Sequence, residues 1–351
     1  MTVEPLTVSG IPYIELYSAD PTAMIGYFRD GMGFTATPVP PSSPDRESVV
    51  LQHGAIRLVV SSPAGGSGPV AEYADRHGDG VGDIAFGVAD PVTAYHAAVR
   101  AGAEPVREPA VRPAAGIGTM LTATVRGVGD LVHTFVPTGT VGAARQVDGE
   151  PLLHLVDHAA ICLPAGTLAS GVDFYTTVFG LRSIFAERIE VGEQAMNSEV
   201  VQNETGDVTF TLIEPDVAGQ PGQIDAFLAR HHGAGVQHLA FLTPDIGAAV
   251  RALQNGSVRF LPAPSQYYTA VAARLPDIAG EVERLRELNV LVDRDHWGYL
   301  LQIFTQSVHP AGTLFFELIE RRQARTFGSG NIRALYEAVE QGRLASAAER
   351  P

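Results

Sequence analysis

The sequence predicts an α+β protein of two domains, each built from paired βαβββ units. Two observations support this prediction: the chain repeats its own order of strands and helices, and its composition suits two packed cores. The 351 residues are 45% hydrophobic and 18% charged, as in ordinary globular proteins. We expect residues 1–140 to form the first domain and residues 151–351 the second.

The clearest repeat joins a glycine-rich turn, an apolar strand and a helix that begins at an aspartate. The first copy, from Arg76, reads RHGDGVGDIAFGVADPVTAYHAAVRAGAEPV, and the second, from Arg230, reads RHHGAGVQHLAFLTPDIGAAVRALQNGSVRFL. Asp90 and Asp245 stand where helix N-caps belong, and a glycine follows each helix. We therefore expect the same strand–helix–strand unit in both halves.

A second pair of segments extends the repeat. The strand IPYIELY and the strand VDHAAICL are each followed by a helix and then by an alternating hairpin, SVVLQHGAIRLVVSSP or SEVVQNETGDVTFTLIEP. Each half thus reads strand, helix and three strands, twice over. The small and polar stretch Thr138–Glu150 is the expected linker. An amphipathic helix that begins at Asn331 is expected to close the chain as a lid or plug.

Charge and composition exclude several classes of protein. The net charge of −15 disfavours a nucleic-acid partner, because phosphate binding needs a basic face. The single cysteine, Cys162, excludes a disulfide framework and a thiolate metal cluster. No apolar run reaches the roughly 18 residues that span a bilayer, and the N-terminus lacks the pattern of a signal peptide. We expect a cytoplasmic protein without a membrane partner.

Three candidate metal ligands fall on expected strands of the second half: His158, His238 and Glu317. Two imidazoles and one carboxylate form the facial triad of non-haem iron(II) oxygenases, which leaves other metal positions open. A histidine on an apolar strand can equally be a core or rim residue. A carboxylate inside the run Phe315–Ile319 is harder to explain, because burial is costly unless the charge is paired or metal-bound.

The first half offers a comparison within the chain. The positions that align with the candidate ligands are Tyr13, Asp83 and, in a weaker alignment, His133. This set is a poor iron site. We therefore expect one metal ion per chain, in the second half, and a metal-free first half.

Duplicated βαβββ units resemble the vicinal-oxygen-chelate, or glyoxalase-like, fold, in which paired units form a half-open barrel around a metal. Over nearly the whole chain, the motifs HGDGVGDIAF, GQIDAFL, GAGVQHLAF, LVDRDHWGYLLQIFT, FFELIER and TFGSGNIRALYEAVE resemble the 4-hydroxyphenylpyruvate dioxygenase family, which includes 4-hydroxymandelate synthase. This resemblance implies an Fe(II) cofactor on His158, His238 and Glu317. It implies 4-hydroxyphenylpyruvate and O2 as small-molecule partners and leaves a homodimer open.

The resemblance also implies a substrate pocket, in which Ser198, Gln302 and Ile332 would act in catalysis. The implied substrate-binding positions are Ser198, Thr211, Ile213, Gln223, Gln237, Gln302, Phe304, Phe315, Phe327, Asn331, Ile332 and Tyr336.

Three runs favour the synthase within this family. Thr211–Pro215 stands where the dioxygenases typically have Pro-Ile-Asn-Glu-Pro, the run Thr326–Ile332 ends in isoleucine where they typically have phenylalanine, and Met196–Ser198 is synthase-like. The resemblance then implies benzylic hydroxylation to 4-hydroxymandelate and CO2, and a role in antibiotic biosynthesis. The alternative is a dioxygenase that makes homogentisate.

Two functions of other kinds are compatible with the fold. An extradiol catechol dioxygenase also uses two histidines and a glutamate, but would lack the glutamines at 223, 237 and 302. An antibiotic-sequestering protein would be a single small domain without the full triad.

Overall fold

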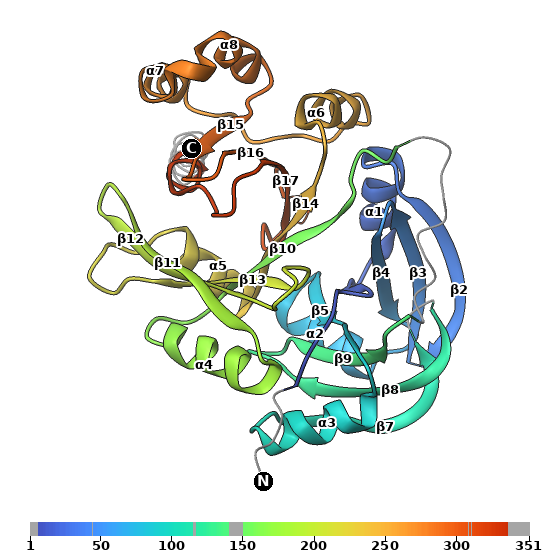
Figure 1. The fold of residues 1–351 in the computed structure, drawn as a ribbon. Coiled ribbons are helices and arrows are strands. Elements are labelled where there is room, and N and C mark those ends of the chain that lie inside the picture. Colours follow the sequence, from blue (N-terminus) through green and yellow to red (C-terminus); the bar gives the residue numbers. More distant parts are fainter. Residues whose placement is uncertain are drawn as a thin grey trace, which may run out of the picture.

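Two curved β-sheets, one from each half of the chain, form the framework of the protein (Figure 1). The computed structural model describes residues 6–43, 45–114, 117–139, 150–307, 309 and 311–335. Most of the expected linker, residues 140–149, and the end of the expected closing helix, including Tyr336, lie outside these described residues. Residues 329–335 are helical, so this helix begins two residues before the predicted start.

Both sheets are antiparallel for the most part, with three parallel pairings in the first sheet and two in the second. The strands of the first sheet are β1 (Ile14–Tyr17), β2 (Thr35–Ser43), β3 (Arg46–His53), β4 (Ile56–Pro63), β5 (Gly80–Ile84), β6 (Phe86–Val88), β7 (Pro105–Ala114), β8 (Gly118–Arg126) and β9 (Val132–Pro137). Those of the second are β10 (Leu155–Cys162), β11 (Arg182–Val191), β12 (Gln194–Gln202), β13 (Thr209–Pro215), β14 (Gly235–Leu242), β15 (Leu291–Arg294), β16 (Tyr299–Phe304) and β17 (Phe315–Arg322).

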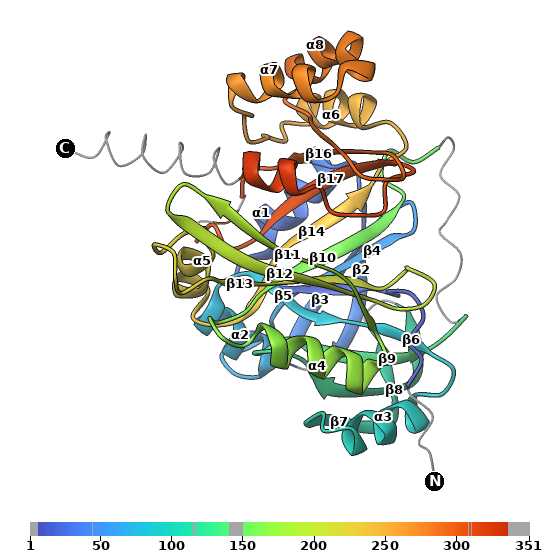
Figure 2. The same ribbon diagram turned by 60° about the vertical axis from the view of Figure 1, so that its left-hand side comes forward.

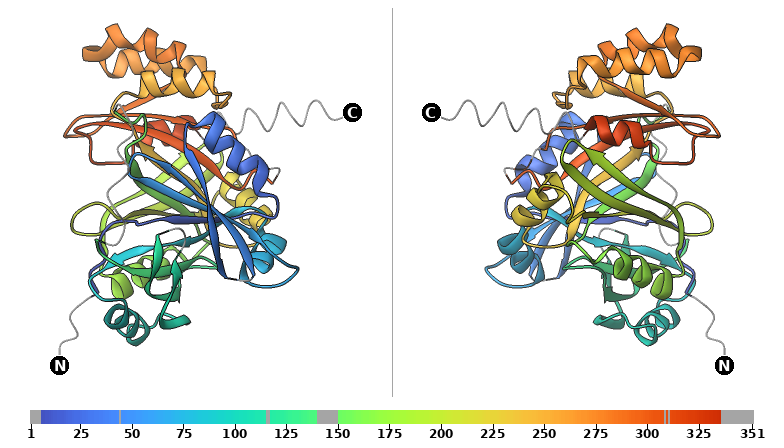
Figure 3. Two further views of the ribbon diagram at one scale, coloured as in Figure 1. Left: turned by 90° about the vertical axis from the view of Figure 1, so that its right-hand side faces the viewer. Right: turned by 90° about the vertical axis from the view of Figure 1, so that its left-hand side faces the viewer.

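The helices lie outside the curved sheets. They are α1 (Pro21–Gly26), the π-helical turn η1 (Tyr27–Gly31), α2 (Pro69–His77), α3 (Pro91–Arg100), α4 (Leu168–Phe179), α5 (Gln223–His231), α6 (Ile246–Asn255), α7 (Ser265–Arg274), the 3-10 turn η2 (Pro276–Ile278) and α8 (Ala279–Glu287). Helices α3 and α4, one from each half, lie side by side at one end (Figure 2), and α6, α7 and α8 gather at the other (Figure 3).

The internal repeat is confirmed by the strand order. The first sheet runs β2-β3-β4-β1-β5-β9-β8-β7, and the second runs β11-β12-β13-β10-β14-β17-β16-β15, which is the same order. The predicted N-caps are also present, since Asp90 accepts hydrogen bonds from Val92 N and Thr93 N, and Asp245 accepts one from Ala248 N. The predicted α+β class of two half-open barrels is therefore confirmed. The domain boundaries at 140 and 151 stay a prediction.

The two halves share one hydrophobic core. Phe86 and Phe135 of the first half pack in the same cluster as Tyr175, Phe179 and Phe210 of the second. The rings of Phe86 and Phe179 meet edge to face, with their centroids 5.1 Å apart. Burial of aromatic surface from both halves couples their stability.

The strand register corrects the predicted alignment of His133 with Glu317. Asp83 is the counterpart of His238, and it pairs with Val132 as His238 pairs with Phe315. Two residues further along these strands stand Thr134 and Glu317, so Thr134 is the true counterpart. A one-residue shift moves a side chain to the opposite face of a sheet.

His133 accordingly points into the core between the halves. Its ring stacks on Phe86 with centroids 4.5 Å apart, and its Nε2 lies 3.1 Å from the hydroxyl of Tyr175. Burial lowers the pKa of His133 to about 4, so the ring is neutral at pH 7.

Tyr13, Asp83 and Thr134, the counterparts of the candidate ligands, form a hydrogen-bonded cluster in the first half. Both the backbone N–H and the hydroxyl of Thr134 donate to the Asp83 carboxylate, at 3.0 and 2.5 Å, and the Tyr13 hydroxyl donates at 3.3 Å. A phenol, a carboxylate and an alcohol that satisfy one another provide no imidazole for iron. The metal-free first half remains a prediction, and this cluster is its physical basis.

The buried Asp83 carboxyl makes stability depend on pH. Burial and then the charge of Glu15 raise the pKa of Asp83 to about 7. In the unfolded chain this group loses its proton near pH 4, so its contribution to stability is present below pH 4 and is lost as pH rises through 7.

We predict that Asp83→Asn raises the free energy of unfolding at pH 8 by about 2–4 kcal/mol, because an amide avoids the cost of burying a charge. The gain should vanish near pH 4, where both proteins are neutral at this position. Urea denaturation at the two pH values measures the difference, with exposed Asp75→Asn as the control. A variant less stable than wild type at pH 8 would contradict this account.

Candidate metal centre

Three neighbouring strands bring His158, His238 and Glu317 together inside the second barrel. His158 lies on β10, His238 on β14 and Glu317 on β17, and β14 pairs with both of the other strands. Alternate residues of a strand face the same side, so the pairing aims all three side chains inward. All three are buried, and Glu317 is only 1% exposed.

The three side chains converge at one point. The Nε2 atoms of His158 and His238 each lie 3.5 Å from Oε2 of Glu317. One donor atom from each residue lies within 4.8 Å of the others, and the described part of the chain contains no second such group of His, Cys, Asp or Glu. The spacing leaves room for one ion between three donors.

A second layer of side chains orients both imidazoles. His158 Nδ1 donates to Asp157 Oδ1 at 2.9 Å, and His238 Nδ1 donates to Gln237 Oε1 at 3.2 Å. With Nδ1 protonated, each ring keeps a free lone pair on Nε2, which is the atom that faces the other ligands. These bonds set the tautomer that a metal requires.

The electrostatics of the centre favour a cation. Burial raises the pKa of Glu317, and burial followed by the charge of His158 lowers the pKa of His238 well below its usual range. A carboxylate buried at this depth is costly unless a cation compensates its charge. A divalent cation that prefers nitrogen and oxygen ligands satisfies all three groups at once, so the donor set fits such a metal.

Asp157 is held in turn by an arginine from β17. Arg321 donates to Asp157 from Nε at 2.7 Å and from Nη2 at 2.8 Å, a bidentate pair. Burial alone would raise the pKa of Asp157, but the bonds from Arg321 and His158 hold it below its usual range. Arg321 also lies over the ring of Phe327, 5.1 Å from its centroid. Neither Asp157 nor Arg321 was predicted as a site residue, although Asp157 directly precedes His158 and Arg321 follows Glu317 by four residues.

Gln302 connects the centre to the closing helix. Its Nε2 donates to Glu317 Oε1 at 2.8 Å, and its Oε1 accepts from Asn331 Nδ2 at 2.8 Å. The predicted need of this buried amide for a partner is therefore met within the chain. Gln302 holds the Glu317 oxygen that does not face the imidazoles.

A narrow pocket opens beside the three candidate ligands. Eight of the predicted substrate-binding residues line it: Ser198, Thr211, Ile213, Gln237, Gln302, Phe304, Phe327 and Ile332. Met196 and Leu335 also line the pocket and were not predicted to do so. Met196 precedes Ser198 by two residues on β12, so the alternation of that strand could have identified it.

Three predicted pocket residues lie elsewhere. Phe315 is not part of the lining and instead stacks on His238, with ring centroids 4.9 Å apart. Asn331 is not part of the lining either; its side chain forms hydrogen bonds with Gln302, which does line the pocket, and with the hydroxyl of Tyr267. Gln223 stands at the start of α5, outside the lining, and its buried Nε2 has no partner among the described residues. Tyr336 lies outside the described residues.

Comparison with protein families gives two matches. The model described as the N-terminal part of hydroxyphenylpyruvate dioxygenase matches residues 3–139. The model of the glyoxalase, bleomycin resistance protein and dioxygenase superfamily matches residues 155–303. The first match spans all strands of the first barrel, and the second ends within β16, before β17.

Individual relatives and a solved structure agree with these families. The 4-hydroxyphenylpyruvate dioxygenase of Dictyostelium discoideum is 33% identical over 315 residues, which cover 84% of this chain and 86% of the relative. That of Danio rerio is 33% identical over 298 residues, 79% of this chain and 75% of the relative. A triple mutant of 4-hydroxymandelate synthase from Streptomyces coelicolor is 46% identical, with a TM-score of 0.88 over 96% of this chain and all of that chain. The chain therefore belongs to the 4-hydroxyphenylpyruvate dioxygenase family of vicinal-oxygen-chelate proteins.

Proposed function

We propose that the protein is an iron(II)-dependent dioxygenase that converts 4-hydroxyphenylpyruvate and O2 into 4-hydroxymandelate and CO2. The observation that carries this proposal is the convergence of His158, His238 and Glu317 at the wall of a buried pocket. The 46% identity to a 4-hydroxymandelate synthase, against 33% to the dioxygenases, supports the synthase product. Family membership leaves an extradiol catechol dioxygenase and an antibiotic-sequestering protein without support.

His158, His238 and Glu317 would hold the iron, which when bound supplies the site where a 2-oxo acid chelates and O2 is activated. The chain itself binds and orients the aromatic end of the substrate. Apolar side chains of the lining exclude water, while the Thr211 hydroxyl is buried without a partner among the described residues. Such a hydroxyl is available to bond a polar group of the substrate.

Two isoleucines are the proposed basis of benzylic hydroxylation. Ile213 and Ile332 pack in one apolar cluster with Met196 at the pocket wall. Neither side chain can hydrogen-bond a ring substituent, and neither offers a flat surface against the ring. The aromatic ring can therefore turn and present its CH2 group to the reaction centre. A preference of about 1.4 kcal/mol between the two outcomes is enough for a tenfold product ratio.

A cytoplasmic location stays a prediction from the sequence, a role in antibiotic biosynthesis stays an implication of the family resemblance, and a homodimer stays open. Among the described residues, no helix is long and apolar enough to cross a membrane.

The first prediction from this proposal concerns the metal. Wild-type protein should bind about one iron per chain, and Ala at His158, His238 or Glu317 should lower iron content and turnover at least tenfold, because a facial triad needs all three ligands. Elemental analysis and oxygen uptake measure both quantities, with the exposed His96→Ala as the matched control. Two irons per chain, or full activity in Glu317→Ala, would refute the site.

The second prediction concerns Gln302. Gln302→Leu removes the bonds to Glu317 and Asn331, so we expect kcat to fall about 10- to 100-fold while the protein stays folded. Steady-state kinetics and circular dichroism test this, with exposed Gln306→Leu as the control. Unchanged kinetics with lowered stability alone would make Gln302 a structural residue only.

The third prediction concerns the product. Chromatography after turnover of 4-hydroxyphenylpyruvate should show mainly 4-hydroxymandelate from wild type. Ile332→Phe, alone or with Ile213→Asn, should divert part of the flux to homogentisate or another ring-oxidised product, because a flat side chain restricts ring rotation. Exposed Ile184→Phe should leave the product unchanged. Homogentisate as the main wild-type product would replace this proposal with the dioxygenase assignment.

A further inference from the structure

The first barrel contains a hollow at the place that the metal pocket occupies in the second. Tyr13 and Thr134, the counterparts of His158 and Glu317, line it. Thr124 pairs with Thr134 as Phe304 pairs with Glu317, and Thr124 also lines the hollow. The cavity measures about 310 Å³. The half without the triad therefore also has a cavity at the equivalent position.

The lining of this hollow contains arginines, whereas the pocket of the second barrel contains the candidate metal ligands. Arg46, Arg107 and Arg112 line the hollow, whereas Glu15 is the one acidic residue in the lining. The lining of the metal pocket, by contrast, contains no arginine. In a protein of net charge −15, a cavity with three guanidinium groups is a local reversal of charge.

The donors of these arginines are only partly used. Arg46 is 5% exposed and pairs with Glu15 at 3.1 Å and with Asp45 at 3.4 Å, but its buried Nε has no partner in the described structure. Arg112 donates from Nη2 to the carbonyl of Glu108 at 2.9 Å, and its buried Nη1 likewise has none. Buried donors without acceptors are costly, so they indicate a missing acceptor.

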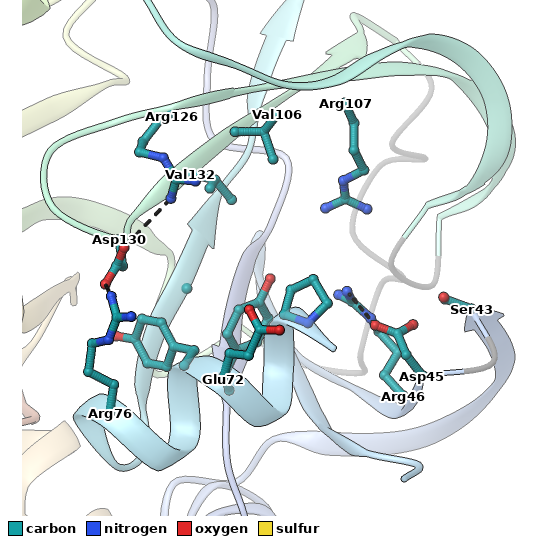
Figure 4. Close-up of a pocket in the computed structure, with 14 residues that line it drawn as sticks. Ser43, Asp45, Arg46, Glu72, Arg76, Val106, Arg107, Arg126, Asp130 and Val132 are labelled. Carbon is teal, nitrogen blue, oxygen red and sulfur yellow. Dashed lines mark hydrogen bonds and ion pairs between the residues drawn. The ribbon is translucent and has the colours of Figure 1, made fainter. Parts of the chain in front are cut away.

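Arg107 interacts with Tyr13 and Asp83 only through its charge at a distance. Its side chain makes no hydrogen bond or ion pair within the described ranges, and its guanidinium extends into the open space facing Arg46 (Figure 4). Burial and then Arg107 lower the pKa of Arg112, which shows that the two cations repel. An anion between them would relieve this repulsion.

A second hollow adjoins the first and shares Ser43, Arg46 and Arg107 with it. Its other charges are largely balanced, because Arg76 and Arg126 lie 2.6 and 3.7 Å from the oxygens of Asp130. Figure 4 shows this paired group on the far side of the hollow from Arg107. Arg107 and Arg112, by contrast, form no ion pair among the described residues, so they carry the unpaired positive charge at the first hollow.

We propose that the hollow of the first barrel is a binding site for a small oxyanion, a carboxylate or a phosphate, held by Arg46, Arg107 and Arg112. Guanidinium groups bind such oxyanions through paired N–H donors, and the unused donors at this site match that need. The cavity volume suits an anion of up to the size of an aromatic carboxylate. The site is independent of the metal centre and of the proposed reaction.

Isothermal titration calorimetry on the full iron-loaded chain tests the proposal, with inorganic phosphate and benzoate as separate probes. At least one probe should bind wild type, and the double variant Arg107→Gln with Arg112→Gln should weaken that binding at least tenfold. Exposed Arg100→Gln, which removes one positive charge from the same half, should change the affinity less than twofold. Binding of phosphate alone, benzoate alone or both supports the proposal and identifies the oxyanion.

Melting temperature without probe separates a binding role from a structural one. A double variant that melts close to wild type is expected, because the only protein hydrogen bond among the described residues that it loses is the exposed one from Arg112 to the carbonyl of Glu108. A marked fall in melting temperature would assign the arginines to structure and overturn the proposal. Absence of binding to wild type by either probe would also overturn it. So would binding that survives in the double variant and disappears in Glu317→Ala, because that places the anion at the metal centre.

Discussion

The buried carboxylate of Glu317 is the constraint on which the second barrel depends. It lies at 1% exposure within 3.5 Å of two imidazole nitrogens, in a position that water cannot solvate. A charge at this depth requires compensation, and the surrounding structure provides part of it. Gln302 donates to one carboxylate oxygen, and the other faces His158 and His238, where a divalent cation would complete the balance.

The bonds that support this carboxylate also connect the centre to distant parts of the chain. Gln302 forms hydrogen bonds with both Glu317 and Asn331, and Asn331 lies on the closing helix. Arg321 forms hydrogen bonds with Asp157 and lies over the ring of Phe327. Rotation of the closing helix would disturb both connections. Asn331 lies on this helix, and Phe327 stands two residues before its first residue. The position of the closing helix and the geometry of the three candidate ligands are therefore coupled.

The two barrels contain different polar residues at equivalent buried positions. Where the second barrel has two imidazoles and a carboxylate, the first has the Tyr13–Asp83–Thr134 cluster, whose members bond to one another. The repeat was enough to predict that both halves share one order of strands and helices along the chain, and that His158, His238 and Glu317 lie on strands of the second half. Thr134 was missed because β9 could be aligned only by its apolar pattern, and a one-residue shift selects His133 instead. The Asp157–Arg321 pair joins residues 164 positions apart, and a single sequence contains no signal for such a contact.

Anomalous diffraction at the iron edge tests the central claim most directly, since it locates the metal in the folded chain. Crystals of iron-loaded protein should show one anomalous peak per chain, bounded by Nε2 of His158, Nε2 of His238 and the carboxylate of Glu317. The first barrel should show none beside Tyr13, Asp83 and Thr134. A peak of similar height in the first barrel, or a peak away from these three ligands, would contradict the account.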